Sequence, residues 1–395
     1  MITLARLIEQ FEPDLLLRHG HHLLPSQVQA LSAMARCRTR FAPQMLAQCS
    51  ACGEQRCVPH SCGHRACPHC QQHESQLWLQ RQLQSLVPAT YFLITFTLPG
   101  ELRALAWSHQ RLVYPMLMQC AWQTLASFSR NDARLAATPG AVGVLHTHSR
   151  RLDLHPHVHM VMPAAALDTQ RGLWRTKCRR PRRRGQAAAA QAGSGGFLFS
   201  HKALAKVFRA KLLAALQAAG LRLPDSLPAT WVVDCRCVGD GQKALLYLGR
   251  YLYRGVVQEA DILSCCGGKV TFRYRDARSG KAALRTLPGA DFLWLVLQHV
   301  LPKGLRRARS FGFLHPNSRR ALRLLQLLHL RPVRPPAQAA PVPRPVWRCG
   351  CGGAMSVLRR RMPPEVAKSQ SSSANSAAPH DKPDKAHPME GFTTH

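Results

Sequence analysis

The sequence has few acidic residues. Its 395 residues include 20 Asp and Glu against 54 Lys and Arg, which gives a formal net charge of +34 and a pI near 10.9. Solubility alone does not require such an excess of one sign. The charge therefore predicts a polyanionic partner, and nucleic acid is the first candidate because each neutralised phosphate releases counterions.

Long apolar runs are also missing. The chain contains no stretch of about 18 apolar residues, which a membrane-spanning helix would need, and its start lacks the pattern of a signal peptide. An anionic membrane surface is therefore the weaker candidate partner, and we expect a soluble, intracellular protein. Because 46% of the residues are hydrophobic, the chain can bury a sizeable core and is not disordered as a whole.

Strand and helix patterns mix along the chain without strict alternation. This mixture predicts an α+β fold with an antiparallel sheet, because a parallel sheet would need a helix between successive strands. The expected strands are Thr90–Pro99, Val142–His148, Leu154–Pro163 and Thr230–Val238, and the expected helices include Gln71–Val87, Glu101–Arg130 and Ser200–Gly220.

Composition divides the chain into three parts. We expect a helical, cysteine-rich domain at 1–88 and a sheet-containing domain at 89–330, interrupted by a basic, mobile insertion at about 174–196. A proline-rich linker and a serine-rich, disordered tail follow at 331–395.

Cysteines are numerous and clustered. Seven of the fifteen lie between Cys37 and Cys70, and in an intracellular chain such clustering favours metal binding over disulfides. We expect the two C-x-x-C knuckles to close one tetrahedral zinc site through Cys49, Cys52, Cys67 and Cys70. Residues left over for a second site, or for replacing one ligand, are Cys37, Cys57, Cys62, His60 and His64.

A last pair, Cys349 and Cys351, is separated by one residue. This spacing strains a common chelate, so we expect the pair to be unligated or degenerate. Two alternative roles stay open for the cysteine-rich segment: it binds DNA, or it only stabilises the fold of the N-terminal domain.

Three histidines alternate in the stretch LHPHVHMVMP, Leu154 to Pro163. Side chains two apart in a strand share a face, so His155, His157 and His159 line one side and the apolar residues face the other. Imidazoles arranged in this way form a chelate for a divalent cation, with room left for water or a phosphate oxygen. The alternative is a row of partly exposed strand histidines with no shared task.

Two tyrosines are spaced by one helical turn in LLYLGRYLYRG. Tyr247, Tyr251 and Arg254 share one face of the expected helix, whereas Tyr253 lies about 200° around from Tyr251 and is excluded from a shared site. A tyrosine hydroxyl can attack a phosphodiester and hold it as a phosphotyrosine if a metal polarises the phosphate. Amphipathic tyrosines at a domain surface are the alternative.

These two stretches, HPHVH upstream of YLGRYLYR, resemble the two-tyrosine HUH transposases of bacterial insertion sequences, the IS91 type, which move by a rolling-circle-like mechanism. SCGHRACPHCQQHESQLWL is similar to that family's zinc-binding N-terminal domain, and YFLITFTLPGEL to its junction with the catalytic domain. VTFRYRDARSGK and HVLPKGLRRARSFG are similar to later blocks. The matches occur in the family's order and cover most of the chain.

The resemblance implies roles for individual residues. His157 and His159 match the pair that holds a divalent metal, magnesium or manganese, and Tyr247 and Tyr251 match the paired nucleophiles. The implied core is an antiparallel HUH nuclease sheet, with the histidines on a central strand and the tyrosines on a helix packed beside it. The implied zinc is structural.

Two points stay open within the resemblance. The third metal ligand is not fixed, and both His155 and His146 are candidates. Ala66 stands before the second knuckle where the family often has histidine, while His64 lies nearby, so the number of zinc ions is open. CGCGG at the last cysteine pair resembles a terminal knuckle of the family that normally reads C-x-x-C.

The implied activity is transposition of a DNA element in the bacterial cytoplasm, on nucleoid DNA. One tyrosine would cut single-stranded DNA at the element ends and leave a 5′-phosphotyrosine and a free 3′-hydroxyl, and the second would cleave or accept the target strand. A replication initiator or relaxase is one rival, because it runs the same nicking chemistry. The other is a non-catalytic, zinc-dependent nucleic-acid-binding protein, such as a decayed transposase.

Basic clusters supply candidate contacts to the DNA backbone, which set affinity but not sequence choice. The first cluster could equally be a solvated arm, and it comprises Arg175, Lys177, Arg179, Arg180, Arg182, Arg183 and Arg184. The other candidates for DNA binding are Arg250, Arg254, Lys303, Arg306, Arg307 and Arg309.

Overall fold

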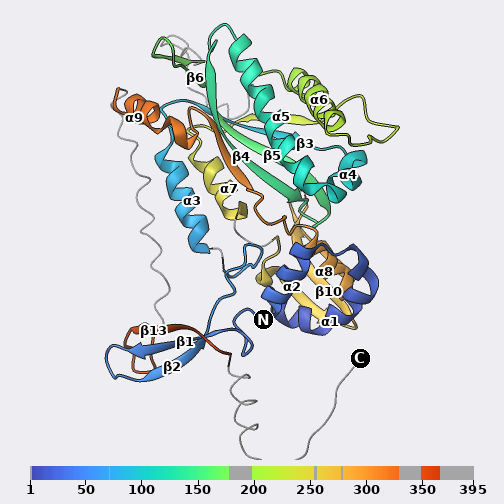
Figure 1. The fold of residues 1–395 in the computed structure, drawn as a ribbon, viewed down its shortest axis with the longest axis vertical. Coiled ribbons are helices and arrows are strands. Elements are labelled where there is room, and N and C mark those ends of the chain that lie inside the picture. The colour runs from blue at the N-terminus through green and yellow to red at the C-terminus, as the bar shows by residue number, and fades with distance from the viewer. Residues whose placement is uncertain are drawn as a thin grey trace, which may run out of the picture. The chain divides into compact units, whose positions relative to one another are not determined.

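The computed structural model divides the chain into two compact units (Figure 1). The larger comprises Met1–Ala35 and Cys62–Pro345, and the smaller comprises Arg36–Ser61 and Val346–His395. This division differs from the linear one expected from the sequence, because each unit contains two separate stretches of chain. The structure describes residues 2–70, 72–177, 198–252, 256–276, 279–328 and 348–364.

A seven-stranded antiparallel sheet forms the centre of the larger unit, which confirms the α+β class (Figure 1). The strand order is β7-β6-β4-β5-β3-β8, and β12 pairs with β4. The bounds are β3 Tyr91–Thr97, β4 Thr138–His148, β5 Leu154–Pro163, β6 Ala165–Asp168, β7 Leu173–Thr176, β8 Val233–Cys237 and β12 Ala308–Gly312.

One face of this sheet is covered by three helices, α4 (Arg103–Ser108), α5 (Gln110–Asn131) and α6 (His201–Ala218). Strand residues at alternate positions are buried against these helices. One of them is Phe96, whose ring centroid lies 4.8 Å from that of Phe208 on α6. Fully burying a side chain of this size contributes about 1.5–3 kcal/mol.

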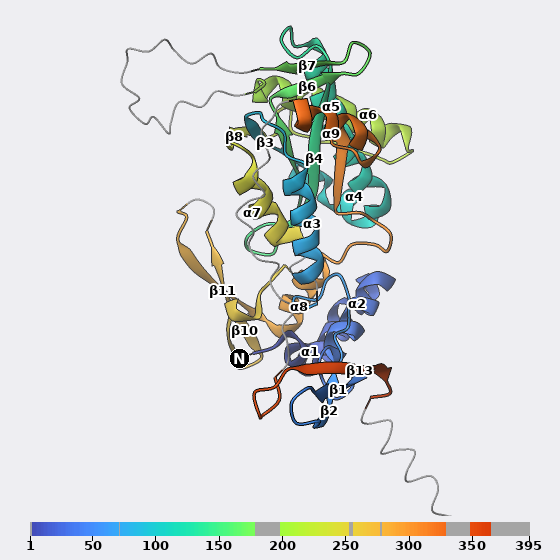
Figure 2. The same ribbon diagram turned by 90° about the vertical axis from the view of Figure 1, so that its left-hand side faces the viewer.

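The opposite face carries a second apolar cluster. It is covered by α3 (Gln72–Gln84), α7 (Gln242–Leu252) and α9 (Arg319–Leu328). Both views show α7 beside α3 (Figures 1 and 2). The buried strand residues on this side include Val144 and Val161. His146 lies two residues after Val144 on β4 and His159 two residues before Val161 on β5, so these histidines share the same face.

The rest of the larger unit contains two N-terminal helices, a three-stranded antiparallel sheet in the order β11-β10-β9, and a further helix. The first helix, α1, packs on α8, and the buried Gln27 of α2 donates a hydrogen bond to the Leu297 carbonyl of α8 at 2.8 Å. The bounds are α1 Leu4–His19, α2 Pro25–Arg36, β9 Ile262–Cys266, β10 Lys269–Arg275, β11 Ala282–Pro288 and α8 Gly289–Leu297, with short 3₁₀ helices at Gly20–His22, Gly100–Leu102, Glu259–Asp261 and Pro316–Ser318.

The smaller unit contains one three-stranded sheet, in the order β13-β1-β2. Its strands are β1 Gln44–Cys49, β2 Gln55–Pro59 and β13 Met355–Met362. Across the described ranges of both units, no helix combines the length and apolar character that crossing a bilayer requires.

Gly312, at the end of β12, has a φ of +58°, and a Cβ atom there would overlap the carbonyl oxygen of Pro139. We expect Gly312→Ala to lower the free energy of unfolding by about 1–2 kcal/mol for left-handed strain and by a further ~1–3 kcal/mol for the overlap. Urea denaturation followed by tryptophan fluorescence measures the loss.

Gly304→Ala is the matched control for this prediction. Gly304 also has a positive φ, of +84°, but among the described residues other than its chain neighbours no atom lies within 4 Å of its ideal Cβ position. This variant should therefore show the strain alone, and equal losses in the two variants would contradict the steric account.

Candidate active site

The site is built from histidines on two neighbouring strands. The register of β4 and β5 places His146 opposite His157 and Val144 opposite His159. Since directly opposed residues share a face and alternate residues along a strand do too, these three imidazoles lie on one side of the sheet. One ligand nitrogen from each lies within 4.8 Å of the other two. This spacing allows the three nitrogens to bind one metal ion.

The hydrogen bonds of the paired histidines orient their rings. Nδ1–H of His157 donates to the carbonyl oxygen of His155 at 2.6 Å. A carbonyl oxygen only accepts, so the proton is on Nδ1 and the lone pair of His157 is on Nε2. His159 Nδ1 lies 2.9 Å from the Thr95 hydroxyl on β3, and the same tautomer there would donate to Thr95. Metal-binding histidines are typically anchored in this way through the second ring nitrogen.

Burial keeps these imidazoles neutral. It lowers the pKa of His157 to about 4 and that of His159 to about 3. The pKa of His146 is also held well below its usual value, first by burial and then by the neighbouring His159 and His157. The neutral form is the one that binds a metal ion, so the residues present fit a divalent cation.

His155 shares the strand face but has a different partner. Arg103 Nη2 donates to His155 Nδ1 at 3.1 Å, and burial together with the Arg103 charge lowers the pKa of His155. Of the two candidates for a third ligand, the structure groups His146, and not His155, with His157 and His159.

His299, which the sequence patterns did not indicate, follows α8 and is buried beside the site. Its Nε2–H donates to the Leu152 carbonyl at 2.8 Å, and its Nδ1 lies 3.2 Å from the Thr147 hydroxyl on β4. It therefore holds the end of β4 and the turn before β5 in place. A single histidine in an apolar helix-like run gave no signal for this role.

The tyrosine-bearing helix packs on the same face of the sheet as the histidines. Leu245 and Leu248 of α7 are buried in the cluster that contains Val144 and Val161, and these two valines alternate with the histidines on β4 and β5. Tyr247 is 41% exposed.

The two tyrosines are one turn apart on α7, because Tyr251 lies four residues after Tyr247. The side chains of Tyr251 and Arg250 lie outside what the structure describes, as do Tyr253 and Arg254 entirely.

α7 is fixed by its contact with α3. The Ser75 hydroxyl donates to the Gly249 carbonyl at 2.7 Å. A Cβ at Gly249 would lie 3.4 Å from both Trp78 and Leu79, at the start of ordinary van der Waals contact, so the two helices pack closely where the glycine between the tyrosines lies.

One basic segment reaches the edge of the site. The Arg307 carbonyl accepts a hydrogen bond from Leu145 N–H at 2.8 Å, just before β12 pairs with β4. Burial is the largest cause of the lowered pKa of His146, His148 and His299, and the positive charge of Arg307 lowers each of them further.

The other expected basic cluster has its first two members in ion pairs. Arg175 pairs with Asp168 at 3.9 Å, and Lys177 pairs with Asp132. Its remaining arginines, at 179–184, lie outside the described residues.

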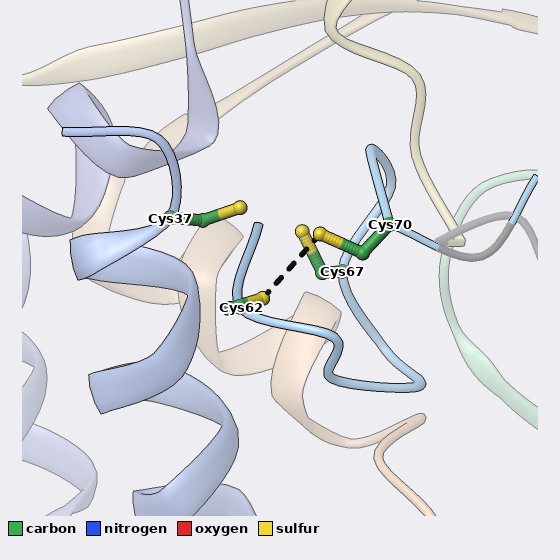
Figure 3. Close-up of side chains that lie close together, drawn as sticks. All are labelled: Cys37, Cys62, Cys67 and Cys70. Carbon is green, nitrogen blue, oxygen red and sulfur yellow. Dashed lines mark hydrogen bonds between the residues drawn. The ribbon is translucent and has the colours of Figure 1, made fainter. Parts of the chain in front are cut away.

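The cysteines form two groups, and their membership differs from the expectation. Cys67 and Cys70 lie with Cys37 and Cys62, as Figure 3 shows, and the sulfurs of Cys62 and Cys70 are 3.6 Å apart. Cys37 directly follows α2, and the others lie on the loop before α3. Cys49 and Cys52 belong instead with Cys349 and Cys351. The single site expected from Cys49, Cys52, Cys67 and Cys70 is therefore wrong in its grouping, because the strand pairing of β1 brings in the distant C-terminal segment.

His64 is not in either group. Its Nδ1 accepts a hydrogen bond from Ala66 N–H at 3.2 Å, and burial together with Arg65 lowers its pKa. His60 and Cys57 are also outside both groups.

Two family models match the chain. One, described as "Putative transposase", matches residues 140–321, and the other, described as "Transposase zinc-binding domain", matches residues 7–98. The first range includes the histidine strands and the tyrosine helix, and the second includes the four expected zinc ligands near the N-terminus.

Two curated relatives are also named as transposases. The chain is 29% identical over 315 residues to "Putative transposase y4qJ" of Sinorhizobium fredii, which covers 74% of this chain and 75% of the relative. It is 28% identical over 303 residues to the transposase for insertion sequence element IS801 of Pseudomonas savastanoi pv. phaseolicola, covering 73% and 70%. No solved structure matches. The chain therefore belongs to the IS91-type transposases, with a zinc-binding domain at its N-terminus.

Proposed function

We propose that this transposase cuts and rejoins single-stranded DNA through a 5′-phosphotyrosine intermediate, in rolling-circle-type transposition. The observation that supports this most strongly is that the histidine group and the tyrosine-bearing helix α7 share one face of the central sheet. A phosphodiester bound at the histidines would lie on the face that α7 covers.

His146, His157 and His159 would hold a divalent cation in this proposal. When bound, the cation polarises the scissile phosphate and stabilises charge on the leaving oxygen. Magnesium and manganese both accept phosphate oxygens, and three nitrogen ligands favour manganese because magnesium prefers oxygen.

The tyrosines supply the nucleophile. The phenolic oxygen of Tyr247 or Tyr251 forms a bond to phosphorus while the bond from phosphorus to the 3′-oxygen breaks. The tyrosine loses its proton, and the departing 3′-oxygen gains one and becomes a free hydroxyl. Because the phosphotyrosine retains the energy of the broken bond, a 3′-hydroxyl can later reverse the step and rejoin a strand. A second tyrosine one turn away allows two strands to be handled without release.

Basic residues beside the sheet would bind the DNA backbone. Lys303 and Arg306 are exposed on the segment that leads into β12, next to β4 and His146. Arg309 lies on β12 and Arg307 just before it. Arg250 and Arg254 would add contacts from the tyrosine segment.

A replication initiator or a relaxase would run the same chemistry at a different locus. The matched family models and relatives favour a transposase over both. A non-catalytic DNA-binding protein would keep the basic surface and the zinc but would form no covalent complex.

Covalent trapping tests the proposed chemistry. We expect labelled single-stranded DNA from the element's ends to form an SDS-resistant complex with the full-length protein in the presence of Mn²⁺, and Tyr247→Phe with Tyr251→Phe to abolish it, since no other group replaces the attacking hydroxyl. The single variants identify the residue that attacks first.

Two controls accompany the trapping assay. Tyr274→Phe, on the β10 hairpin, should leave the complex intact, and EDTA should remove it until Mn²⁺ is restored. A complex that persists in the double variant, or the absence of any complex while DNA binding is retained, would contradict the proposal.

The third ligand can be tested separately. We expect His146→Ala to raise the Mn²⁺ concentration for half-maximal complex formation by at least ~10-fold, because losing a ligand should cost no less than losing a supporting contact. His155→Ala is the matched control and should leave Mn²⁺ affinity, followed by electron paramagnetic resonance, unchanged. The opposite ranking would assign the ligand to His155.

The proposed DNA contacts of the basic segment before β12 can be tested through the dependence of DNA affinity on salt concentration. Replacing either Lys303 or Arg306 with alanine should lower the slope of log affinity against log salt for single-stranded DNA by about 0.7, the value for one lost phosphate contact. Fluorescence anisotropy at several salt concentrations measures the slope. Lys202→Ala, on α6 across the sheet, should leave it unchanged, and an equal fall in this control would contradict a specific DNA path along β12.

A further inference from the structure

The sheet of the smaller unit joins two distant parts of the chain. β13, near the C-terminus, pairs antiparallel with β1, with Cys49 opposite Met355 and Ala47 opposite Val357. β2 pairs with the other edge of β1. The central strand of this sheet therefore depends on a C-terminal segment that lies outside the matched zinc-binding range, residues 7–98.

This sheet has almost no apolar core. Within the part of the unit that the structure describes, the buried cluster consists of Ala47, Cys49, Cys349 and Met355, and the other buried apolar side chains are those of Cys37, Ala42 and Met45. So few buried side chains cannot offset the entropy of ordering three strands, and small domains of this kind are usually held by disulfides or a metal.

Four sulfur atoms converge at the end of the sheet. Cys351 Sγ lies 3.5 Å from Cys49 Sγ and 3.4 Å from Cys52 Sγ, and Cys349 Sγ lies 3.6 Å from Cys52 Sγ. A disulfide would need about 2.05 Å. Tetrahedral zinc with bonds of about 2.3 Å would place its sulfurs roughly 3.8 Å apart. The observed spacing fits the metal and not the disulfide.

The backbone turns that carry the cysteines also favour a metal site. Gly53 N–H donates to the Cys49 carbonyl at 3.1 Å, and Gly352 N–H donates to the Cys349 carbonyl at 2.9 Å, so each cysteine pair lies on a closed turn. A Cβ at Gly353 would lie 2.7 Å from Cys49 Sγ. Glycine at this position therefore leaves room for the sulfur cluster.

We propose that Cys49, Cys52, Cys349 and Cys351 bind a structural zinc ion that completes the zinc-binding domain with the C-terminal end of the chain. The one-residue spacing of Cys349 and Cys351 is compatible with this site, because both sulfurs reach Cys52. The Cys349 thiol donates to the Glu54 carboxylate at 2.8 Å, and zinc takes the place of that proton. The inference does not depend on the proposed DNA chemistry, since its readout is metal content.

Zinc content of full-length proteins tests the site. By mass spectrometry of metals, we expect the Cys349→Ser, Cys351→Ser double variant to hold one zinc per chain fewer than the wild type. Cys57→Ser is the matched control, because Cys57 is an exposed cysteine of the same sheet outside both groups, and it should hold the wild-type amount. Unchanged zinc in the double variant would overturn the proposal, and iron in the same ratio would overturn the assignment to zinc.

Alkylation of cysteines in the wild-type protein tests the same zinc site without any substitution, so it applies even if the double variant does not fold. Cys52, Cys57 and Cys351 are all exposed, so burial alone predicts similar reactivity toward N-ethylmaleimide. We expect Cys57 to react at once, whereas Cys52 and Cys351 react only after a chelator is added, as read by peptide mass spectrometry. Cys351 that reacts as fast as Cys57, while Cys52 stays protected, would overturn the proposal.

Discussion

Hydrogen bonds between β4 and β5 set His146 opposite His157, and this register determines what the sheet can do. A slip of one residue would turn the β5 histidines toward the face covered by α5 and α6, and would turn Val158 and Met160 out of the core. The buried apolar residues of β5 therefore hold the histidines on the other face. The same residues that stabilise the fold also position the proposed metal ligands.

One face of the central sheet is packed into the main core, and the other carries the histidines. Helices α4, α5 and α6 cover one face, and α3, α7 and α9 cover the part of the other face that carries Val142, Val144 and Val161. The histidines continue the same alternation along β4 and β5 toward the ends nearest the turn between them. Packing of α7 on the valines consequently keeps the tyrosine segment on the histidine side.

Local patterns predicted the elements of the site but not every partner. Alternation along one strand was enough to place His157 and His159 on one face, and the α+β class followed from the mixed order of elements. The choice between His146 and His155 needed the register of two strands and the position of Arg103, which bonds His155. Neither is encoded in spacing along one stretch of chain. The cysteine grouping was predicted wrongly for the same reason: Cys49 and Cys52 lie in the same group as cysteines about 300 residues away, and only the pairing of β1 with β13 brings them together.

The most direct test is the position of a bound manganese ion, from anomalous diffraction of crystals soaked in Mn²⁺. We expect a peak bound by Nε2 of His157 together with ring nitrogens of His159 and His146, on the face of the sheet where α7 packs. A peak bound by His155 in place of His146, or no peak at the histidines while DNA cleavage still requires the metal, would contradict this expectation.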